Sequence, residues 1–371
     1  MDKWTGVYAL AFAGAMGLSA GLTVVFRRIA WRTGFLDLPA NNHKGHARAT
    51  ALLGGAAMFC SWLGMLALGW CAVTGGWLPE SLREVWSGHV AGMKHVMGPL
   101  GFIGLGALLA VVLGLIDDKW ALSAKSKFAG QFAVALIAVL GGGVRVNLFL
   151  DAPVLTAAVT VFWIVLMMNS INFFDNMDGL AAGTIAIAMG FFAVIAALNR
   201  EYFVATFAAL NCGVCCGFWI FNTSPASIFM GDSGSHFLGY LAAVVAAQVT
   251  FFDKSYSLSR FPVLIPAFIL ALPLFDTAMV VAIRTCRRVP FWIGDHNHIS
   301  HRFVRMGLSR RSAVALVHLM ALTVALGALG ALPVFWGDFK TGAVIVAQMF
   351  LLLIIITVIQ LHLGEKNRGG D

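Results

Sequence analysis

The feature that most constrains the fold of this chain is a succession of apolar segments, each long enough to cross a lipid bilayer. A bilayer core about 30 Å thick needs roughly 20 apolar residues in helical form, and eleven such segments can be counted in the 371 residues. The predicted spans are 6–26, 51–74, 97–116, 128–144, 153–168, 179–198, 202–221, 236–252, 261–283, 313–335 and 341–363. No soluble domain fits between them, so we expect one integral membrane domain over residues 1–371, an all-α polytopic helix bundle.

Composition supports a membrane protein and argues against a serine protease. Only 11% of the residues are charged and 60% are hydrophobic, whereas about a quarter of a soluble domain is charged. The segment GDSGS at 231–235 differs by one letter from the motif around the nucleophile of trypsin-like proteases. That motif works in a β-barrel protein, and a chain of apolar helices offers no such context. Ser233 is therefore a poor candidate for a nucleophile.

Lys and Arg are distributed unevenly between the two faces that the predicted spans define. With eleven spans, 17 of the 25 basic residues lie on one side. Because basic loops remain in the cytoplasm during insertion, we expect the N-terminus outside and the C-terminus inside. This topology accounts for the net charge of +8. There is no basic domain outside the membrane, so we expect no nucleic-acid partner.

Five polar segments fall on the same predicted face. They are 37–48, 117–127, 169–180, 230–236 and 294–302, and they contain carboxylates, amides, lysines and histidines. The loops on the opposite face have scattered charges and no comparable cluster. We therefore expect an active site at the cytoplasmic face.

The side chains in these segments suit a divalent cation and phosphate groups. Mg²⁺ takes oxygen ligands, usually one or two carboxylates together with substrate phosphates, and Lys and Arg bind phosphates directly. Asp117 and Asp118 are adjacent like charges, which repel by about 4 kcal/mol at 4 Å for an effective dielectric near 20. A cation or a nearby lysine would relieve that repulsion. Solvated charge at the membrane edge is the alternative for this pair.

The segment NSINFFDNMDGL at 169–180 is more specific. Asn169, Asn172, Asp175 and Asp178 recur at every third residue. Gly179 follows the last aspartate and a new apolar run begins at once, so we expect a helix, a short irregular stretch and a second helix. An ordinary polar loop would not give such regular spacing.

Three further features remain open on residue chemistry alone. Asp232 begins the predicted eighth span and is either a ligand or an N-cap. Phe229 either stacks on a base or packs in the membrane. The histidines at 296, 298 and 301 share a loop with several arginines and lack zinc-enzyme spacing, which favours an anion site over a metal site.

Taken in order, these motifs resemble the polyprenyl-phosphate N-acetylhexosamine-1-phosphate transferases, known as glycosyltransferase family 4. The resemblance rests on DD at 117–118, NxxNxxDxxDGL at 169–180, FMGDSGS at 229–235, PLFDT at 273–277 and DxxHxxH at 295–301. It is greatest for the undecaprenyl-phosphate N-acetylglucosaminyl-1-phosphate transferases, because Arg284 follows the PLFDT segment. It implies transfer of a sugar 1-phosphate from a UDP-N-acetylhexosamine to a polyprenyl phosphate, with release of UMP. It also implies a location in the bacterial plasma membrane and allows a homodimer.

The resemblance also implies a role for each matching residue. Asp232 and Asn172 would bind Mg²⁺ or Mn²⁺, and Asp117 and Asp118 would lie beside the metal and the lipid phosphate, whose proton one aspartate would accept. Catalytic roles fall to Asp117, Asp118, Asp175, Asp178, His298 and His301. Substrate-binding roles fall to Lys44, His46, Lys125, Lys127, Asn169, Phe229, Arg284, Asp295 and Arg302.

The chain departs from the family pattern in places, which leaves the sugar open. His43 stands where an arginine is usual, Ala51 where a proline is usual, and Ser300 where a histidine is usual. Serine is neutral and short, so we expect Arg302 to supply the positive charge and Ser300→Ala to be mild. The alternatives are the phospho-N-acetylmuramoyl-pentapeptide transferases of the same family and, from another class, a membrane transporter. A CDP-alcohol phosphotransferase is excluded because its motif does not continue after Gly179.

Overall fold

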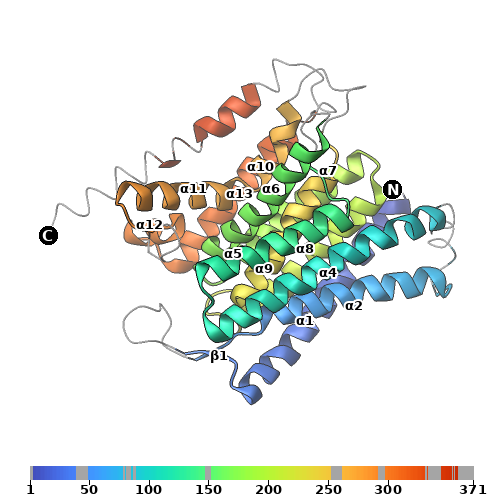
Figure 1. The fold of residues 1–371 in the computed structure, drawn as a ribbon, viewed down its shortest axis with the longest axis horizontal. Helices are drawn as coiled ribbons and strands as arrows, with labels where there is room; N and C mark the ends of the chain where they lie inside the picture. The colour runs from blue at the N-terminus through green and yellow to red at the C-terminus, as the bar shows by residue number, and fades with distance from the viewer. Residues whose placement is uncertain are drawn as a thin grey trace.

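The computed structural model describes residues 3–38, 49–77, 80, 85–86, 89–146, 152–251, 261–290, 297–330, 332, 344–352, 354 and 356–357. Apart from one pair of two-residue strands, the named elements in this part of the chain are helices. The long helices lie side by side with roughly parallel axes (Figure 1). The predicted all-α membrane bundle is therefore confirmed.

Eight helices in the described residues are long and apolar enough to cross a membrane, which makes the protein a multi-pass membrane protein. The eight are α1 (Lys3–Thr33), α2 (Gly54–Thr74), α4 (Val90–Trp120), α5 (Ala124–Leu136) with the turn that follows it, α6 (Pro153–Phe174), α7 (Leu180–Leu198), α8 (Tyr202–Asn222) and α13 (Arg310–Gly330). A π-helical turn, η1 (Ile137–Gly141), continues α5. These helices correspond to eight of the eleven predicted spans, and the count of eleven stays a prediction.

The predicted eighth span corresponds to α9 (Gly231–Gln248), which other helices surround. It packs against α2, α4, α6, α7 and α8 (Figure 1), and residues 233–246 are all buried. A Cβ on Gly239 would lie 2.6 Å from the carbonyl oxygen of Met167, so α6 and α9 touch through backbone at that point. Because protein rather than lipid covers α9, its first two turns can hold polar residues such as Asp232 and His236.

The predicted ninth span, 261–283, is not one helix. The chain forms a 3-10 turn, η2 (Phe261–Leu264), then α10 (Ile265–Ile269), and after Leu270 it continues as α11 (Ala271–Cys286). Pro266 and Pro273 lack backbone N–H donors, so a continuous ladder of helical hydrogen bonds could not run through this segment. Only parts of the predicted span 341–363 lie within the described residues, with helix at 344–352.

The two ends of the bundle differ in chemistry. At the end where α1, α4 and α8 begin, Trp4 stacks on Tyr202 with ring centroids 4.4 Å apart, and His89 meets both rings edge-on. At the other end, β1 (Leu36–Asp37) pairs antiparallel with β2 (Thr50–Ala51), Leu36 facing Ala51. The first cluster is the kind of aromatic belt found at membrane interfaces. The second end carries the polar motifs.

Candidate active site

A cavity of about 570 Å³ opens at the polar end of the bundle. It lies where α4 and α6 end, where α9 and α13 begin, and where β1 and the loop before α9 approach them. Six carboxylates line it: Asp37, Asp117, Asp118, Asp175, Asp178 and Asp232. Asn172, Asn176, Asn222 and Phe229 line it too, and Arg310 is the one cationic residue in its described wall. A cavity of this charge repels anions unless cations enter with them.

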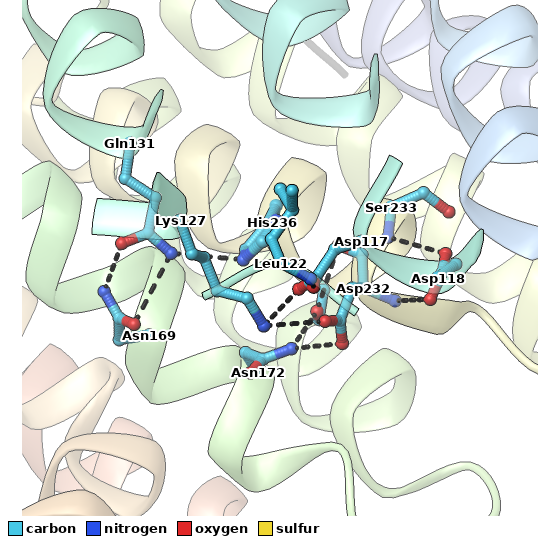
Figure 2. Close-up of polar contacts among 11 residues, drawn as sticks. Asp117, Asp118, Leu122, Lys127, Gln131, Asn169, Asn172, Asp232, Ser233 and His236 are labelled. Atoms are coloured by element: carbon cyan, nitrogen blue, oxygen red, sulfur yellow. Dashed lines mark hydrogen bonds and ion pairs between the residues drawn. The ribbon is translucent and has the colours of Figure 1, made fainter. Parts of the chain in front are cut away.

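The centre of the site is a cluster of four side chains from four helices (Figure 2). Lys127 of α5 forms ion pairs with Asp117 of α4 and with Asp232 of α9, the second at 2.9 Å. Asn172 of α6 donates from Nδ2 to Asp232 Oδ1 at 2.7 Å and to Ser235 Oγ at 2.9 Å. The sequence therefore predicted correctly that residues from three separate motifs meet.

Asp118 binds backbone groups of α9, whereas its neighbour Asp117 pairs with a lysine. Its carboxylate accepts the backbone N–H groups of Asp232 at 2.8 Å and Ser233 at 3.2 Å (Figure 2). These are unsatisfied donors of the first turn of α9, and a carboxylate there also meets the positive end of the helix dipole. Gly231 adopts φ +67° at the junction, and a Cβ on it would lie 2.5 Å from Asp118 Oδ2. Only glycine fits there.

This arrangement decides whether Asp232 is an N-cap. The N-cap position of α9 is Met230 and has no side-chain cap bond. Asp118, from another helix, satisfies the donors instead, so the N-cap alternative for Asp232 is wrong. The Asp232 side chain turns to Lys127 and Asn172. Both hydrogens of the Asn172 amide are used, which leaves its Oδ1 as an acceptor at the cavity wall.

The helix break predicted within residues 169–180 is present. Helix α6 ends at Phe174, α7 begins at Leu180, and Gly179 at φ +76° lies between them. Asp178 accepts the N–H of Ala226 at 3.0 Å, which fixes the loop before α9. Burial, with the nearby charges of Asp232 and Asp118, raises the pKa of the Asp175 carboxyl to about 8. Asp175 therefore keeps a proton near neutral pH in the absence of ligands.

A second polar group lies on α11 and α12 (Ile299–Arg305). Asp276 is buried and accepts from the backbone N–H of Ile299 at 2.6 Å, and its Oδ2 lies 2.7 Å from Nδ1 of His298. The contact orients the imidazole of His298. Arg284 lies over the ring of Phe173, 5.4 Å from its centroid, close to the end of α6. His301 lies near His298, with ring centroids 6.3 Å apart.

Ser300 links this second group to the cavity. It is fully buried and donates from Oγ to Oδ1 of Asn176, a residue of the cavity wall. Arg302 is also buried, and its Nε donates to the carbonyl of Asn297 at 2.9 Å. Ser300 thus has a partner that Ser300→Ala would lose, so a mild effect no longer follows. Arg302 supports the start of α12, and its role as a substrate ligand stays a prediction.

The remaining predicted residues divide into three sets. Phe229 lies on the cavity wall, where its N–H donates to the Ala51 carbonyl at 2.8 Å. Lys125 is exposed and Asn169 bonds with Gln131, and neither belongs to the wall. Lys44, His46 and Asp295 lie outside the described residues.

Several wall residues were missed in the sequence. Asn222 accepts the N–H of Gly179 at 3.0 Å and donates to the Ile228 carbonyl at 2.9 Å, so it fastens the start of α7 to the loop before α9. Asp37 lies beside β2, and Asn176 sits between two predicted aspartates. Arg310 was one arginine of seven in its loop, and nothing in the sequence distinguishes it from the others.

The described residues contain no group of three or more His, Cys, Asp or Glu side chains placed to hold a metal ion. The oxygens of Asp232 and Asn172 nevertheless suit a hard cation that completes its shell with phosphates and water. These two ligands fit such an ion because they share one wall and because the Asn172 carbonyl faces no donor that the structure describes.

Comparison with known proteins agrees with this geometry. The pattern of glycosyl transferase family 4 matches residues 100–250, which include both aspartates of α4, the α6–α7 break and the start of α9. A Bacillus subtilis protein named probable undecaprenyl-phosphate N-acetylglucosaminyl 1-phosphate transferase is 31% identical over 349 residues, 92% of this chain and 87% of that protein. The decaprenyl-phosphate N-acetylglucosaminephosphotransferase of Mycobacterium tuberculosis is 28% identical over 99% of this chain and 96% of its own length.

A phospho-N-acetylmuramoyl-pentapeptide-transferase of Halalkalibacterium halodurans is 38% identical, but over only 36% of this chain and 47% of its own length. The full-length similarity is therefore to proteins named for N-acetylglucosamine 1-phosphate transfer. Taken with the helix bundle and the shared motifs around one cavity, these similarities show that the chain belongs to glycosyl transferase family 4.

Proposed function

We propose that this protein transfers N-acetylglucosamine 1-phosphate from UDP-N-acetylglucosamine to a polyprenyl phosphate, giving polyprenyl-diphospho-N-acetylglucosamine and UMP. The observation that carries the proposal is the full-length similarity to transferases with this named activity. The acceptor would be a long polyprenol such as undecaprenol. Its product would begin the assembly of a cell-envelope glycan.

The charge of the cavity means that two phosphorylated substrates would need a cation with them. Six aspartates and one arginine line it in the described part of the chain, so a bare diphosphate and a lipid phosphate would both be repelled. Positive charge must arrive with the substrates or be provided by Lys127. Positioning and charge neutralisation supply most of the catalysis in phosphoryl transfer.

A divalent cation, Mg²⁺ or Mn²⁺, would be held by Asp232 and by the carbonyl oxygen of Asn172. When bound, it would neutralise charge on the diphosphate. Lys127 holds the Asp232 carboxylate in place at 2.9 Å, and Asn172 holds it from the other side at 2.7 Å. The protein thus orients one carboxylate from two directions before any ligand binds.

In the proposed reaction, an oxygen of the lipid phosphate attacks the sugar-bearing phosphorus of the UDP-sugar. A new P–O bond forms, the bond to the UMP oxygen breaks, and UMP leaves with that electron pair. The second pKa of a phosphate monoester is about 6, so near neutral pH the lipid phosphate attacks mainly as the dianion and needs no base. Asp175 lines the cavity and has a pKa of about 8, so it is mainly neutral at that pH and adds little negative charge against the incoming phosphates.

We propose further that the site faces the cytoplasm and that the N-terminus lies outside. Arg27, Arg28 and Arg32 lie in the last two turns of α1, at the polar end of the bundle, and Lys119 is in the last turn of α4. Basic residues concentrated at one end favour the cytoplasmic side for that end.

The test is a substrate panel with purified protein in detergent and undecaprenyl phosphate as acceptor. UMP release and a lipid-linked product should be obtained with UDP-N-acetylglucosamine, and Asp232→Asn serves as the inactive control. Product with the UDP-N-acetylmuramoyl-pentapeptide alone would favour the other branch of the family. If no UDP-sugar gave UMP release, the proposal would be overturned, and the alternative function, a membrane transporter, would be favoured.

A further inference from the structure

The cluster of Asp117, Lys127, Asn172 and Asp232 is called the reactive cluster below, and a buried group of three polar side chains lies directly behind it. Asn169 of α6 donates to Oε1 of Gln131 of α5 at 2.7 Å, and Nε2 of Gln131 lies 3.1 Å from Nε2 of His236 of α9 (Figure 2). We call Gln131, Asn169 and His236 the amide–imidazole trio. Gln131 and His236 are completely buried, and none of the three lines the cavity.

The trio repeats the reactive cluster one helical turn away. Lys127 and Gln131 are four residues apart on α5, Asp232 and His236 four apart on α9, and Asn172 and Asn169 three apart on α6. Residues at these spacings lie on the same face of a helix, one above the other. The same three helices therefore meet twice, first through Lys127, Asp232 and Asn172 and then, one turn deeper, through the trio.

A contribution to protein stability alone does not explain why the trio is polar. If Gln131 donates to Nε2 of His236, the hydrogen of the imidazole is on Nδ1, and that atom is buried without a hydrogen-bond partner in the described residues. A buried donor left unsatisfied costs about 1–3 kcal/mol. Apolar side chains of similar size would hold three helices together without that cost. Hydrogen bonds are directional, so they also fix the rotation of each helix about its axis and its position along that axis.

We propose that Gln131, Asn169 and His236 are positioning residues, which set the relative rotation of α5, α6 and α9 so that Lys127, Asn172 and Asp232 meet in reactive geometry. The inference rests on the proposed transfer reaction. It gives Asn169 a role one layer away from the substrate, where Asn169 bonds to Gln131 and to the carbonyl of Val165 at 2.8 Å.

The test compares Gln131→Met with Tyr240→Phe. Methionine keeps the length of glutamine but loses the hydrogen bonds to Asn169 and His236. Tyr240 is one turn beyond His236 on α9, is buried, and donates to the Ile103 carbonyl at 3.0 Å. Tyr240→Phe thus removes a buried hydrogen bond that joins α9 to α4, away from the cluster. Both variants should lose thermal stability, but only Gln131→Met should lose turnover.

For Gln131→Met we expect kcat to fall by about 10- to 100-fold, the usual loss when residues that orient ligands are removed. The KM for UDP-N-acetylglucosamine should stay unchanged, since the trio does not line the cavity. Tyr240→Phe should keep the wild-type kcat. Equal kcat values for the two variants, or a loss confined to KM, would overturn the inference.

A second pair of variants covers the case in which Gln131→Met does not fold. Gln131→Asn shortens one amide of the trio and Asn169→Gln lengthens its partner, so each alone should lower kcat and the double variant should recover part of it. Failure of the double variant to exceed either single variant would also overturn the inference. The wild-type assay separates the two questions: a wild type that releases no UMP refutes the proposed function, whatever the variants do.

Discussion

Asp118→Ala should destabilise the protein more than Asp232→Asn, although the two aspartates share one site. Asp118 accepts two backbone N–H groups at the start of α9, at 2.8 and 3.2 Å. Loss of a side-chain cap costs about 0.5–2 kcal/mol, and hydrogen bonds to a charged acceptor are stronger than average. We expect Asp118→Ala to cost about 2–3 kcal/mol, which lowers Tm by about 5 °C in a chain of this size.

Asp232→Asn should leave Tm almost unchanged and remove nearly all turnover. The asparagine keeps a side-chain oxygen for Asn172, and Lys127 keeps its ion pair with Asp117. Loss of one charge also lessens the repulsion with Asp118, which opposes the loss of the ion pair. Without the carboxylate, the proposed cation loses its charged protein ligand.

The assay measures Tm by thermal shift in detergent and UMP release at saturating Mg²⁺, for the wild type and three variants. Asp118→Asn is the matched control, because its amide oxygen still accepts one N–H and should restore part of the stability lost in Asp118→Ala. A Tm loss in Asp232→Asn as large as in Asp118→Ala would refute the assignment of the cap. High residual turnover in Asp232→Asn, or activity of the wild type in EDTA, would refute the ligand role.

Three further predictions follow from the same geometry. Ser300→Ala should lower kcat at least severalfold and Ser300→Thr should retain most of it, because Ser300 donates to Asn176 on the cavity wall; equal values for both in UMP release would contradict this. Because ionisation of Asp175 adds a negative charge to a cavity that must take phosphates, kcat should fall as the pH rises through about 8, the pKa of Asp175, and Asp175→Asn should lack this fall in a pH profile. In a cysteine-free background, a cysteine at Ser309 should be labelled only from the cytoplasm and one at Asn199 only from outside.

The positions of the polar motifs could be predicted because each carries its own signal. Asn172 and Asp175 fall in a regular run that ends at a glycine, and the helix break occurs where that run predicts it. Asp117 and Asp232 are charges at the ends of apolar segments, which are rare unless functional. Because the predicted topology places these motifs on one face of the membrane, they were expected to lie close together, although the sequence does not say which helices pack against each other.

The partners of these residues could not be predicted, because they depend on the packing of helices distant in the sequence. Asp118 and Asp232 are 114 residues apart, and nothing local says that one caps the helix of the other. Asn169 belongs to the same three-residue series as Asn172, yet it bonds to Gln131 because it lies about one helical turn deeper along α6. Gln131 is an isolated polar residue in the predicted apolar span 128–144, which carries no signal of a partner.

The burial of α9 explains why this site can hold so many like charges. A helix that faced lipid could not begin with Asp232 and carry His236 one turn later, because no partner in the membrane would satisfy them. Surrounded by five helices, α9 instead brings a Lys, an Asn and two Asp side chains from its neighbours to its first turn. The carboxylates stay close because Lys127 lies between Asp117 and Asp232, while backbone N–H groups hold Asp118. The excess negative charge on the rest of the wall is left for a cation that accompanies the substrates to neutralise.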